Sequence, residues 1–257
     1  MAIWMALILG LVQGITEFLP VSSSGHLILL QSIFNLPDDL MLFNILLHVA
    51  TLLAVVIVFR RRIWELVKNP FQPTVYALIL ATAITVAFVL VFGDLLERTF
   101  TARVLPVTFM LTAILLVLIS FSSEPVIPGT MFLNPRPLKV GIATGLAQGL
   151  AVIPGFSRSG FTISAALASG VNRERAAEFA FLMSIPIIIA ALVYEIAGAG
   201  GSVSVGVGAV PLIIAFIAAL LSGIFAIKFM LKIVRNIKLY WFSAYLVLIA
   251  ILSIFLI

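Results

Sequence analysis

The chain has 257 residues, of which 63% are hydrophobic and 10% carry a charge, and its mean hydropathy is +1.29. Soluble domains carry about 25% charged residues, so this composition excludes a water-soluble globular protein and predicts an all-α polytopic membrane protein. The chain contains no cysteine, which excludes a disulfide framework, a thiolate metal site and a cysteine nucleophile. The net charge of +5 does not indicate nucleic acid as a partner, because the basic residues lie in short loops between apolar runs.

Residues 3–19 predict a first helix that ends before Pro20, because proline cannot continue the helical hydrogen-bond ladder. Ser22 or Ser23 can cap a second helix that runs to about Phe34. At 1.5 Å per residue, about a dozen residues rise about 18 Å, too little to cross a hydrocarbon core of about 30 Å. We therefore expect these helices to form a re-entrant pair that enters and leaves the membrane by one face.

Six apolar segments follow, each close to the roughly 20 residues that a membrane-spanning helix needs. Between the third and the fourth lies a second interrupted stretch, residues 139–171, which IPGFSRSG divides into two short pieces. The sequence therefore predicts six transmembrane helices plus two re-entrant helix pairs. The predicted spans are Leu40–Phe59, Thr74–Phe92, Val104–Phe121, Glu178–Ala197, Ala209–Leu231 and Leu239–Ile257.

The two interrupted stretches are copies of one motif. GLVQGITEFLPVSSSG at 10–25 and GLAQGLAVIPGFSRSG at 145–160 align without a gap at an offset of 135, with seven identities in sixteen positions. Each copy is followed by three predicted spans, which predicts two repeats, about 1–121 and 136–257, in a single membrane domain. Because three is odd, the second repeat must have inverted topology. Such repeats place their site near the membrane midplane.

The positions of Lys and Arg test this topology independently. With four of the loops on one side, that side holds twelve of the fifteen basic residues, and the positive-inside rule makes it cytoplasmic. Both termini are then external, the first re-entrant pair enters from outside, and the second enters from the cytoplasm. Arg158 lies where their tips meet. The four loops are 60–73, 122–139, 171–177 and 228–238.

Polar groups gather at the two interruptions, and such groups inside a membrane indicate a functional site. Each break leaves the amino end of a short helix directed at the bilayer interior, where free N–H groups and the helix dipole favour a phosphate. Arg158 adds a charged fork for phosphate oxygens. Glu17 shares a helix face with Gln13, and the turn at Pro20 lets His26 approach them, which supplies acid–base groups beside hydroxyls for phosphoryl transfer. The candidate residues are Gln13, Glu17, Ser22, Ser23, Ser24, Gly25, His26, Ser157, Arg158, Ser159 and Gly160.

Several alternatives stay open at this point. One carboxylate is a poor metal cage, which leaves a divalent cation, magnesium or calcium, carried by a diphosphate and contacting Glu17; nothing indicates an organic cofactor. Glu17, His26 and Arg158 each have a structural interpretation when taken alone. His48, alone among aliphatic residues on the first span, fits a structural hydrogen bond as well as a functional role. A transporter of a lipid phosphate is the competing function, because secondary transporters also use inverted repeats with broken helices.

QGITEFLPVSSSGHL resembles the first signature of the undecaprenyl-diphosphate phosphatase family, also called the BacA/UppP or bacitracin-resistance family, and IPGFSRSG resembles the second, PGxSRSG. FNILLHVATLLAV is also similar, so the resemblance covers the whole chain. The sequence departs from the family in Gln13, where some members have Glu, in Asn44, where an acidic residue is common, and in Ala50, where glycine is common.

The resemblance implies a hydrolase that removes one phosphate from a C55 polyprenyl diphosphate at the outer face of the cytoplasmic membrane and so regenerates the carrier lipid for peptidoglycan synthesis. The expected partners are this lipid substrate and membrane lipid, and a homodimer is left open. The family implies Ser23 or His26 as the nucleophile with Glu17 as the base, and Arg158 neutralising the phosphoryl group. The residues implied to line the phosphate site are Gln13, Ser22, Ser24, Ser157 and Ser159.

Overall fold

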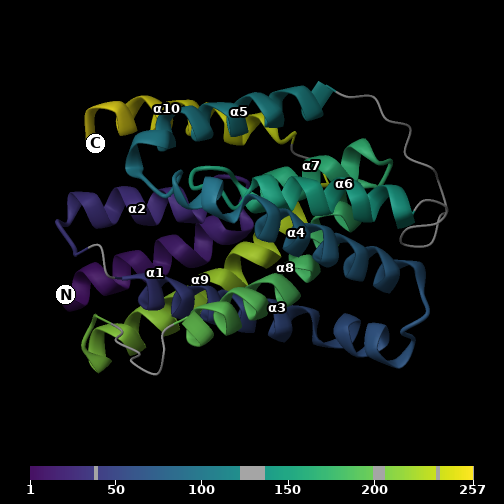
Figure 1. The fold of residues 1–257 in the computed structure, drawn as a ribbon, viewed down its shortest axis with the longest axis horizontal. Coiled ribbons are helices and arrows are strands. Elements are labelled where there is room, and N and C mark those ends of the chain that lie inside the picture. The colour runs from purple at the N-terminus through teal and green to yellow at the C-terminus, as the bar shows by residue number, and fades with distance from the viewer. Residues whose placement is uncertain (38–39, 122–136, 199–205, 236–237, 257) are drawn as a thin grey trace.

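Figure 1 shows the computed structural model, which describes residues 1–37, 40–121, 137–198, 206–235 and 238–256. Within these ranges every regular element is a helix. The elements are α1 (Ile3–Phe18), α2 (Ser23–Ile33), α3 (Met41–Lys68), α4 (Pro73–Glu97), the short 3₁₀ helix η1 (Ala102–Val104), α5 (Leu105–Phe121), α6 (Pro137–Leu150), α7 (Arg158–Ala168), α8 (Arg173–Gly198), α9 (Ala209–Ile233) and α10 (Tyr240–Leu256).

Five helices in the described part of the chain, α3, α4, α5, α8 and α9, are long and apolar enough to cross a membrane. α1 and α10 are also apolar but shorter, with 16 and 17 residues. The chain is therefore an all-helical, multi-pass membrane protein, as its composition predicts.

Three spans are several residues longer than the sequence predicts. One of them, α4, ends at Glu97 rather than at Phe92. α3 continues past Phe59, where the backbone kinks with φ −97° and ψ 15°, to Lys68. α8 begins at Arg173 rather than at Glu178. In each case hydropathy places the boundary near the first charged residues. Long charged side chains at a helix end can extend toward the aqueous side while the backbone stays helical, so hydropathy alone ends these helices too early.

The helix bounds of the two halves of the chain match at an offset of 135. α7 corresponds to α2 residue for residue, and α10 corresponds to α5 in the same way. α6, α8 and α9 correspond to α1, α3 and α4 within a few residues. In Figure 1, α5 and α10 lie side by side and run in opposite directions.

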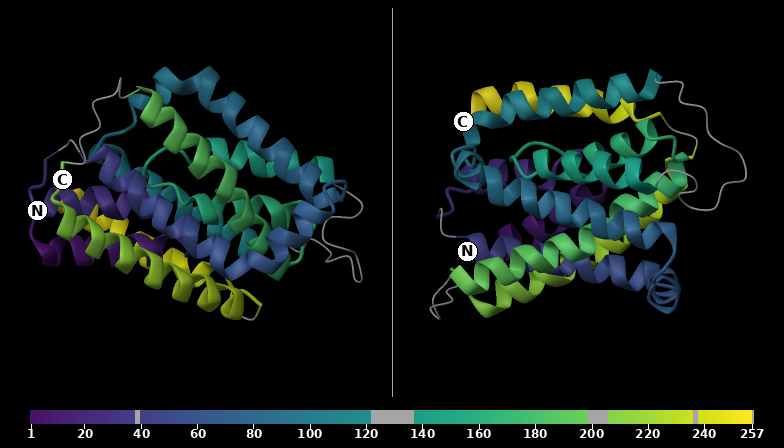
Figure 2. Two further views of the ribbon diagram at one scale, coloured as in Figure 1. Left: turned by 90° about the horizontal axis from the view of Figure 1, so that it is seen from below. Right: turned by 45° about the vertical axis from the view of Figure 1, so that its right-hand side comes forward.

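The first helix of each half packs against a helix of the other half. α1 lies along α9, and α6 lies along α4 (Figures 1 and 2). Glycine permits the first of these contacts, because a Cβ atom added at Gly10 would overlap the backbone carbonyl of Ala215, and one at Gly14 would overlap the hydroxyl of Ser222. Small residues that let two helix backbones approach closely are the usual packing device inside membranes.

Gly10→Ala should therefore lower the thermal stability of the protein in detergent. The added methyl group has to separate α1 from α9, and overpacking of this kind costs about 1–3 kcal/mol. Gly93→Ala on α4 is the matched control, since no atom lies within 4 Å of a Cβ at Gly93, and alanine favours a helix by about 1 kcal/mol over glycine. Thermal unfolding of both variants checks this. Equal stability of the two variants would contradict the close packing.

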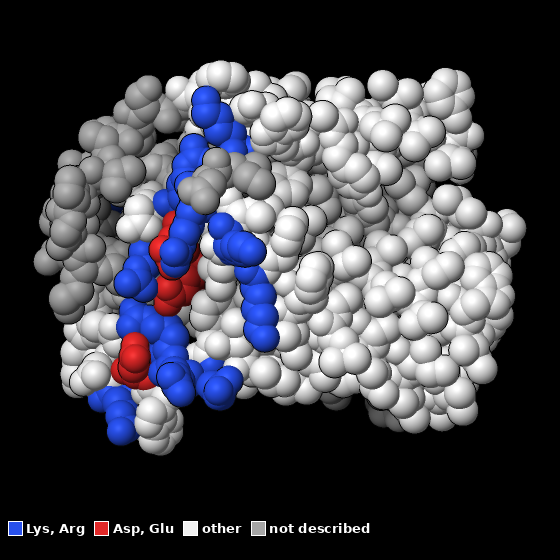
Figure 3. Space-filling view, turned by 180° about the vertical axis from the view of Figure 1, so that it is seen from behind, with Lys and Arg blue, Asp and Glu red and all other residues white. Residues whose placement is uncertain are grey.

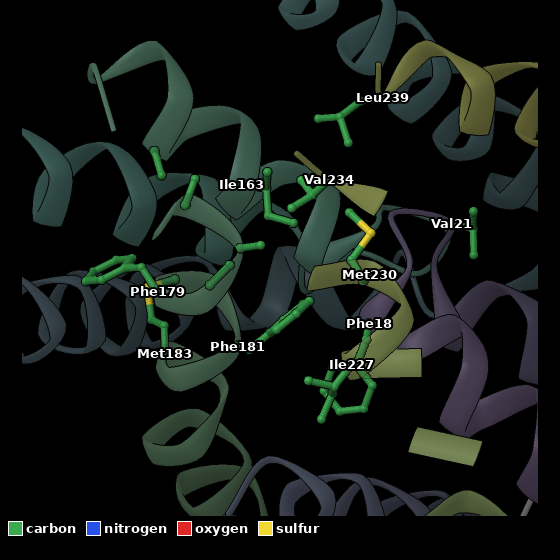
Figure 4. Close-up of a cluster of buried hydrophobic side chains, with 14 of the residues drawn as sticks. Phe18, Val21, Ile163, Phe179, Phe181, Met183, Ile227, Met230, Val234 and Leu239 are labelled. Atoms are coloured by element: carbon green, nitrogen blue, oxygen red, sulfur yellow. The ribbon is translucent and has the colours of Figure 1, made fainter. Parts of the chain in front are cut away.

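Buried aromatic and aliphatic side chains pack around the end of α1. Phe18, at the end of α1, meets Phe181 of α8 edge to face, with ring centroids 5.3 Å apart, and Ile227 and Met230 of α9 belong to the same cluster (Figure 4). Phe18 is followed within a few residues by the first interruption of the chain. The core therefore fixes the position of the end of α1 that carries Glu17.

Charged side chains gather near one end of the molecule. Figure 3 shows them as a belt of Lys and Arg with Asp and Glu among them, next to a wide uncharged surface. Among the charged residues, Arg62 of α3 and Arg175 of α8 both pair with Glu178, and Arg235 pairs with Glu174. Ion pairs thus join the ends of α3, α8 and α9. Most of the predicted basic loop 122–139, including Arg136, lies outside the described residues.

Candidate active site

The two interrupted segments touch each other at the centre of the molecule. Arg158, the first residue of α7, forms an ion pair with Glu17, near the end of α1. The hydroxyl of Ser159 also donates a hydrogen bond of 2.9 Å to the carbonyl of Leu19. The tips of the two motif copies, which lie 135 residues apart in the sequence, therefore form one polar site.

The amino ends of α2 and α7 are built in the same way. Ser22 caps α2 and accepts the Gly25 N–H at 3.3 Å, and Ser157 caps α7 and accepts the Gly160 N–H at 3.1 Å. The serine two residues after each cap also lies beside it: Ser24 Oγ is 3.4 Å from Ser22 Oγ, and Ser159 Oγ is 3.2 Å from Ser157 Oγ. The predicted Ser22 cap is therefore present.

Two features show how tightly the first cap is held. Ser22 has φ +71°, a left-handed conformation that costs a residue other than glycine about 1–3 kcal/mol and is found mostly at functional sites. Gly25 has no room for a side chain, because a Cβ there would lie 2.5 Å from the ring of Phe109. The surrounding packing thus imposes the backbone geometry of SSSG.

Glu17 lies at the centre of the site and is 5% exposed. Its Oε2 accepts hydrogen bonds from Ser23 Oγ at 2.6 Å and from Gln13 Nε2 at 3.0 Å. Its Oε1 faces the Arg158 guanidinium, and His48 Nε2 lies 3.5 Å from Oε2. Because Ser23 points its proton at a carboxylate, its oxygen keeps its lone pairs for another partner. The geometry is that of a hydroxyl nucleophile beside a base.

Some buried polar atoms of this site have no hydrogen-bond partner among the described residues. They include Nη1 of Arg158 and Oε1 of Gln13. An unpaired buried polar group costs about 1–3 kcal/mol, and more when it is charged, so such atoms indicate a binding partner. A guanidinium N–H that is free beside two helix N-termini fits a phosphate oxygen.

His26 has different neighbours from those that the sequence predicts. Its Nδ1 lies 2.6 Å from the Ser22 carbonyl and its Nε2 lies 2.7 Å from the Tyr245 hydroxyl of α10, and the His26 and Tyr245 rings are stacked. The sequence led us to expect His26 beside Gln13 and Glu17. His26 lies one helical turn beyond Ser23 on α2, which carries its ring to α10. The histidine that faces Glu17 is His48 on α3.

Sequence reasoning therefore leaves His48 undecided and misses Tyr245. A polar residue on an otherwise apolar span is the signal for His48. Tyr245 has none, because tyrosine is common near the ends of membrane helices for reasons of solvation alone.

The donor set does not fit a resident divalent cation. Within the residues that the structure describes, no three His, Asp or Glu side chains come together as a metal site. The one central carboxylate, Glu17, already receives donors on both oxygens. Magnesium bound by so few protein groups relies on phosphate oxygens of the substrate.

Comparison with known proteins identifies the family. The family model described as "Bacitracin resistance protein BacA" matches residues 6–252. A relative from Carboxydothermus hydrogenoformans, named undecaprenyl-diphosphatase, is 46% identical over 243 residues, which cover 93% of this chain and 92% of the relative. Proteins of the same name from Treponema denticola and Korarchaeum cryptofilum are 42% and 36% identical, covering 96% and 98% of this chain and 94% and 98% of the relatives. The chain therefore belongs to the BacA family of bacitracin resistance proteins.

Proposed function

We propose that this protein is an integral membrane phosphatase that hydrolyses undecaprenyl diphosphate to undecaprenyl phosphate and inorganic phosphate, and so recycles the carrier lipid for cell-wall synthesis. The observation that carries the proposal is the buried group formed by Glu17, Ser23 and Arg158, which combines a base, a hydroxyl nucleophile and a cation with a free N–H. The name shared by the curated relatives supports the same substrate.

In the first step, Ser23 Oγ attacks the terminal phosphorus, and the bond from that phosphorus to the bridging oxygen breaks. Undecaprenyl phosphate leaves with the bonding electrons, and the Ser23 proton passes to Glu17 Oε2. Arg158 and the N–H groups at the starts of α2 and α7 hold the charge that develops on the phosphoryl oxygens. In the second step, water attacks the phosphorus of the phosphoserine, and the bond from Ser23 Oγ to phosphorus breaks. One proton of the water passes to Ser23 Oγ, which restores the hydroxyl, and the water oxygen leaves on the inorganic phosphate.

Ser23 suits the role of nucleophile better than His26 does. The Ser23 proton already points at Glu17. Both ring nitrogens of His26 are engaged, one by the Ser22 carbonyl and the other by the Tyr245 hydroxyl. We assign His26 a role in proton transfer. Once Tyr245 no longer contacts Nε2, this nitrogen can exchange a proton with the bridging oxygen that leaves in the first step or with the water that attacks in the second.

The proposed arrangement in the membrane has six spanning helices and two re-entrant pairs, α1–α2 and α6–α7, in inverted repeats. The matching helix bounds and the opposite directions of α5 and α10 support it. α10 is the sixth span, because 17 residues rise about 26 Å, close to the thickness of a thin bilayer. In the proposed arrangement, the charged belt lies on the cytoplasmic side of the inner membrane (Figure 3), as the positive-inside rule favours. The site is proposed to open to the extracytoplasmic side. A homodimer stays an expectation that crosslinking in membranes can test.

Any divalent cation, magnesium or calcium, enters this site with the diphosphate. Millimolar Mg²⁺ should therefore leave the melting temperature of the substrate-free protein unchanged. A resident site filled at 100 times its dissociation constant would add about 2.7 kcal/mol of stability. Thermal unfolding in detergent with MgCl₂ or with EDTA checks this, with a rise in melting temperature on adding Mg²⁺ as the contradicting result.

Release of inorganic phosphate from undecaprenyl diphosphate by the purified protein in detergent tests the function. Detergent offers no second compartment, so transport cannot account for phosphate release. The diphosphatase names of the relatives favour hydrolysis over the transporter that the repeats alone would also allow. Glu17→Gln is the control for contaminating phosphatases. Failure of the wild-type protein to release phosphate above that control would overturn the proposal.

A further inference from the structure

His48 of α3 is held with one face toward the site. Its Nδ1 lies 2.8 Å from the carbonyl of Asn44, one turn earlier on the same helix, and its Nε2 lies 3.5 Å from Glu17 Oε2. The side chain is 29% exposed, so it borders open space rather than the packed core. None of the catalytic steps proposed above uses this residue.

The two contacts of His48 show which way each ring nitrogen points. A carbonyl oxygen only accepts, so Nδ1 carries a hydrogen and donates it to Asn44. A carboxylate also only accepts, so a lone pair on Nε2 would repel Glu17 Oε2, and the contact is attractive when Nε2 carries a hydrogen too. Its Nε2 therefore faces Glu17 at a distance at which a ring N–H attracts the carboxylate.

This donor matters most when the substrate arrives. In the substrate-free site, Arg158 forms an ion pair with Glu17. When the substrate is bound, its phosphate also interacts with Arg158. When the unpaired Nη1 of Arg158 binds the phosphate, the guanidinium charge is shared between two anions. The other donors to Glu17, which are Gln13 and Ser23, are neutral. A buried carboxylate whose cation is shared with a second anion loses part of its stabilisation. Among the described residues, His48 is the remaining basic side chain beside Glu17.

We propose that His48 is a positioning residue of the phosphatase, whose Nε2–H holds Glu17 Oε2 in place for Ser23 while Arg158 binds the phosphate. His48 acts through Glu17 and not on the substrate. The inference rests on the proposed function, because it assigns Glu17 the role of base.

Three substitutions separate this role from simple packing. His48→Leu removes the donor, His48→Asn keeps a polar side chain too short to reach Oε2, and His48→Gln places an amide N–H near the position of Nε2. Thr51→Val is the matched control, because Thr51 is on the same helix and its hydroxyl donates to the His48 carbonyl at 2.9 Å without touching Glu17.

We expect His48→Leu and His48→Asn to lower kcat by about 10-fold to 100-fold with little change in KM, the size of effect that a polar interaction with a charged group has. His48→Gln should recover most of that loss, and Thr51→Val should match the wild type. Wild-type kcat in His48→Leu and His48→Asn would overturn the proposal. So would a His48→Gln variant as slow as they are.

A double-mutant cycle gives a second measurement that does not depend on catalysis. His48→Asn should lower the melting temperature of the wild-type protein but leave that of Glu17→Gln almost unchanged, because the partner charge is then absent. Equal losses in both backgrounds would show a structural role and overturn the inference. A wild type that releases no phosphate while the cycle shows coupling would instead overturn the proposed function and leave the Glu17–His48 interaction in place.

Discussion

Arg158→Ala should lower kcat/KM for phosphate release by about 10³-fold to 10⁵-fold, the range that an arginine gains by stabilising a transferring phosphoryl group. Arg158 is the cation of the site, and its unpaired Nη1 is a donor that phosphate can fill. The kcat/KM of Arg158→Lys should lie between that of the wild type and that of Arg158→Ala, because an ammonium keeps the charge but lacks the planar guanidinium that binds two oxygens at once. Initial rates of phosphate release in detergent measure both variants.

Arg158→Ala also leaves Glu17 buried without its charged partner, which costs about 3–5 kcal/mol in comparable pairs. The double variant Arg158→Ala/Glu17→Gln should regain the lost thermal stability but not the activity, which separates the catalytic from the structural effect. Arg235→Ala is the matched control, because it removes an arginine from an exposed pair with Glu174 and should keep full activity. An active Arg158→Ala enzyme would refute the role of the cation.

Much of the site can be predicted from the sequence because the membrane makes polar residues conspicuous. Glu17 and Arg158 are charges inside otherwise apolar stretches, and the gapless repeat pairs the two motifs that carry them. Their ion pair is the contact that this pairing requires. The serine caps follow equally directly from local helix chemistry, since Ser22 and Ser157 stand where each short helix begins.

The direction in which side chains point between helices cannot be predicted in this way. The distance of His26 along the chain places it beside Glu17, but one turn of α2 takes it to Tyr245, more than 200 residues later. The approach of α3 that brings His48 to Glu17 depends likewise on packing between helices. Neither contact can be predicted from the spacing of residues in the sequence or from its hydropathy. The helix ends at Lys68 and Arg173 escape prediction for another reason, because hydropathy measures solvation and not backbone geometry.

Ser23→Ala should reduce phosphate release to the level of the uncatalysed background, and Glu17→Gln should reduce kcat by about 10²-fold to 10⁴-fold, the usual contribution of a general base. The physical reason is the hydrogen bond of 2.6 Å from Ser23 Oγ to Glu17 Oε2, along which Glu17 takes the proton of Ser23. Because the two act as a unit, Ser23→Ala/Glu17→Gln should be no slower than Ser23→Ala alone. Ser24→Ala is the matched serine control: its hydroxyl faces Ser22 rather than Glu17, so it should show a smaller loss.

A covalent intermediate would identify the attacking atom directly. Rapid acid quenching of wild-type enzyme mixed with diphosphate substrate should yield phosphoserine at Ser23, which mass spectrometry of peptides can locate because a phosphate ester on serine survives acid. Attack by His26 would give a phosphohistidine that acid destroys but alkaline quenching preserves. Finding that species, together with a Ser23→Ala variant that keeps its rate, would transfer the nucleophile to His26. It would also require Tyr245 to leave Nε2 before the chemistry, since the tyrosine hydroxyl occupies that nitrogen in the free enzyme.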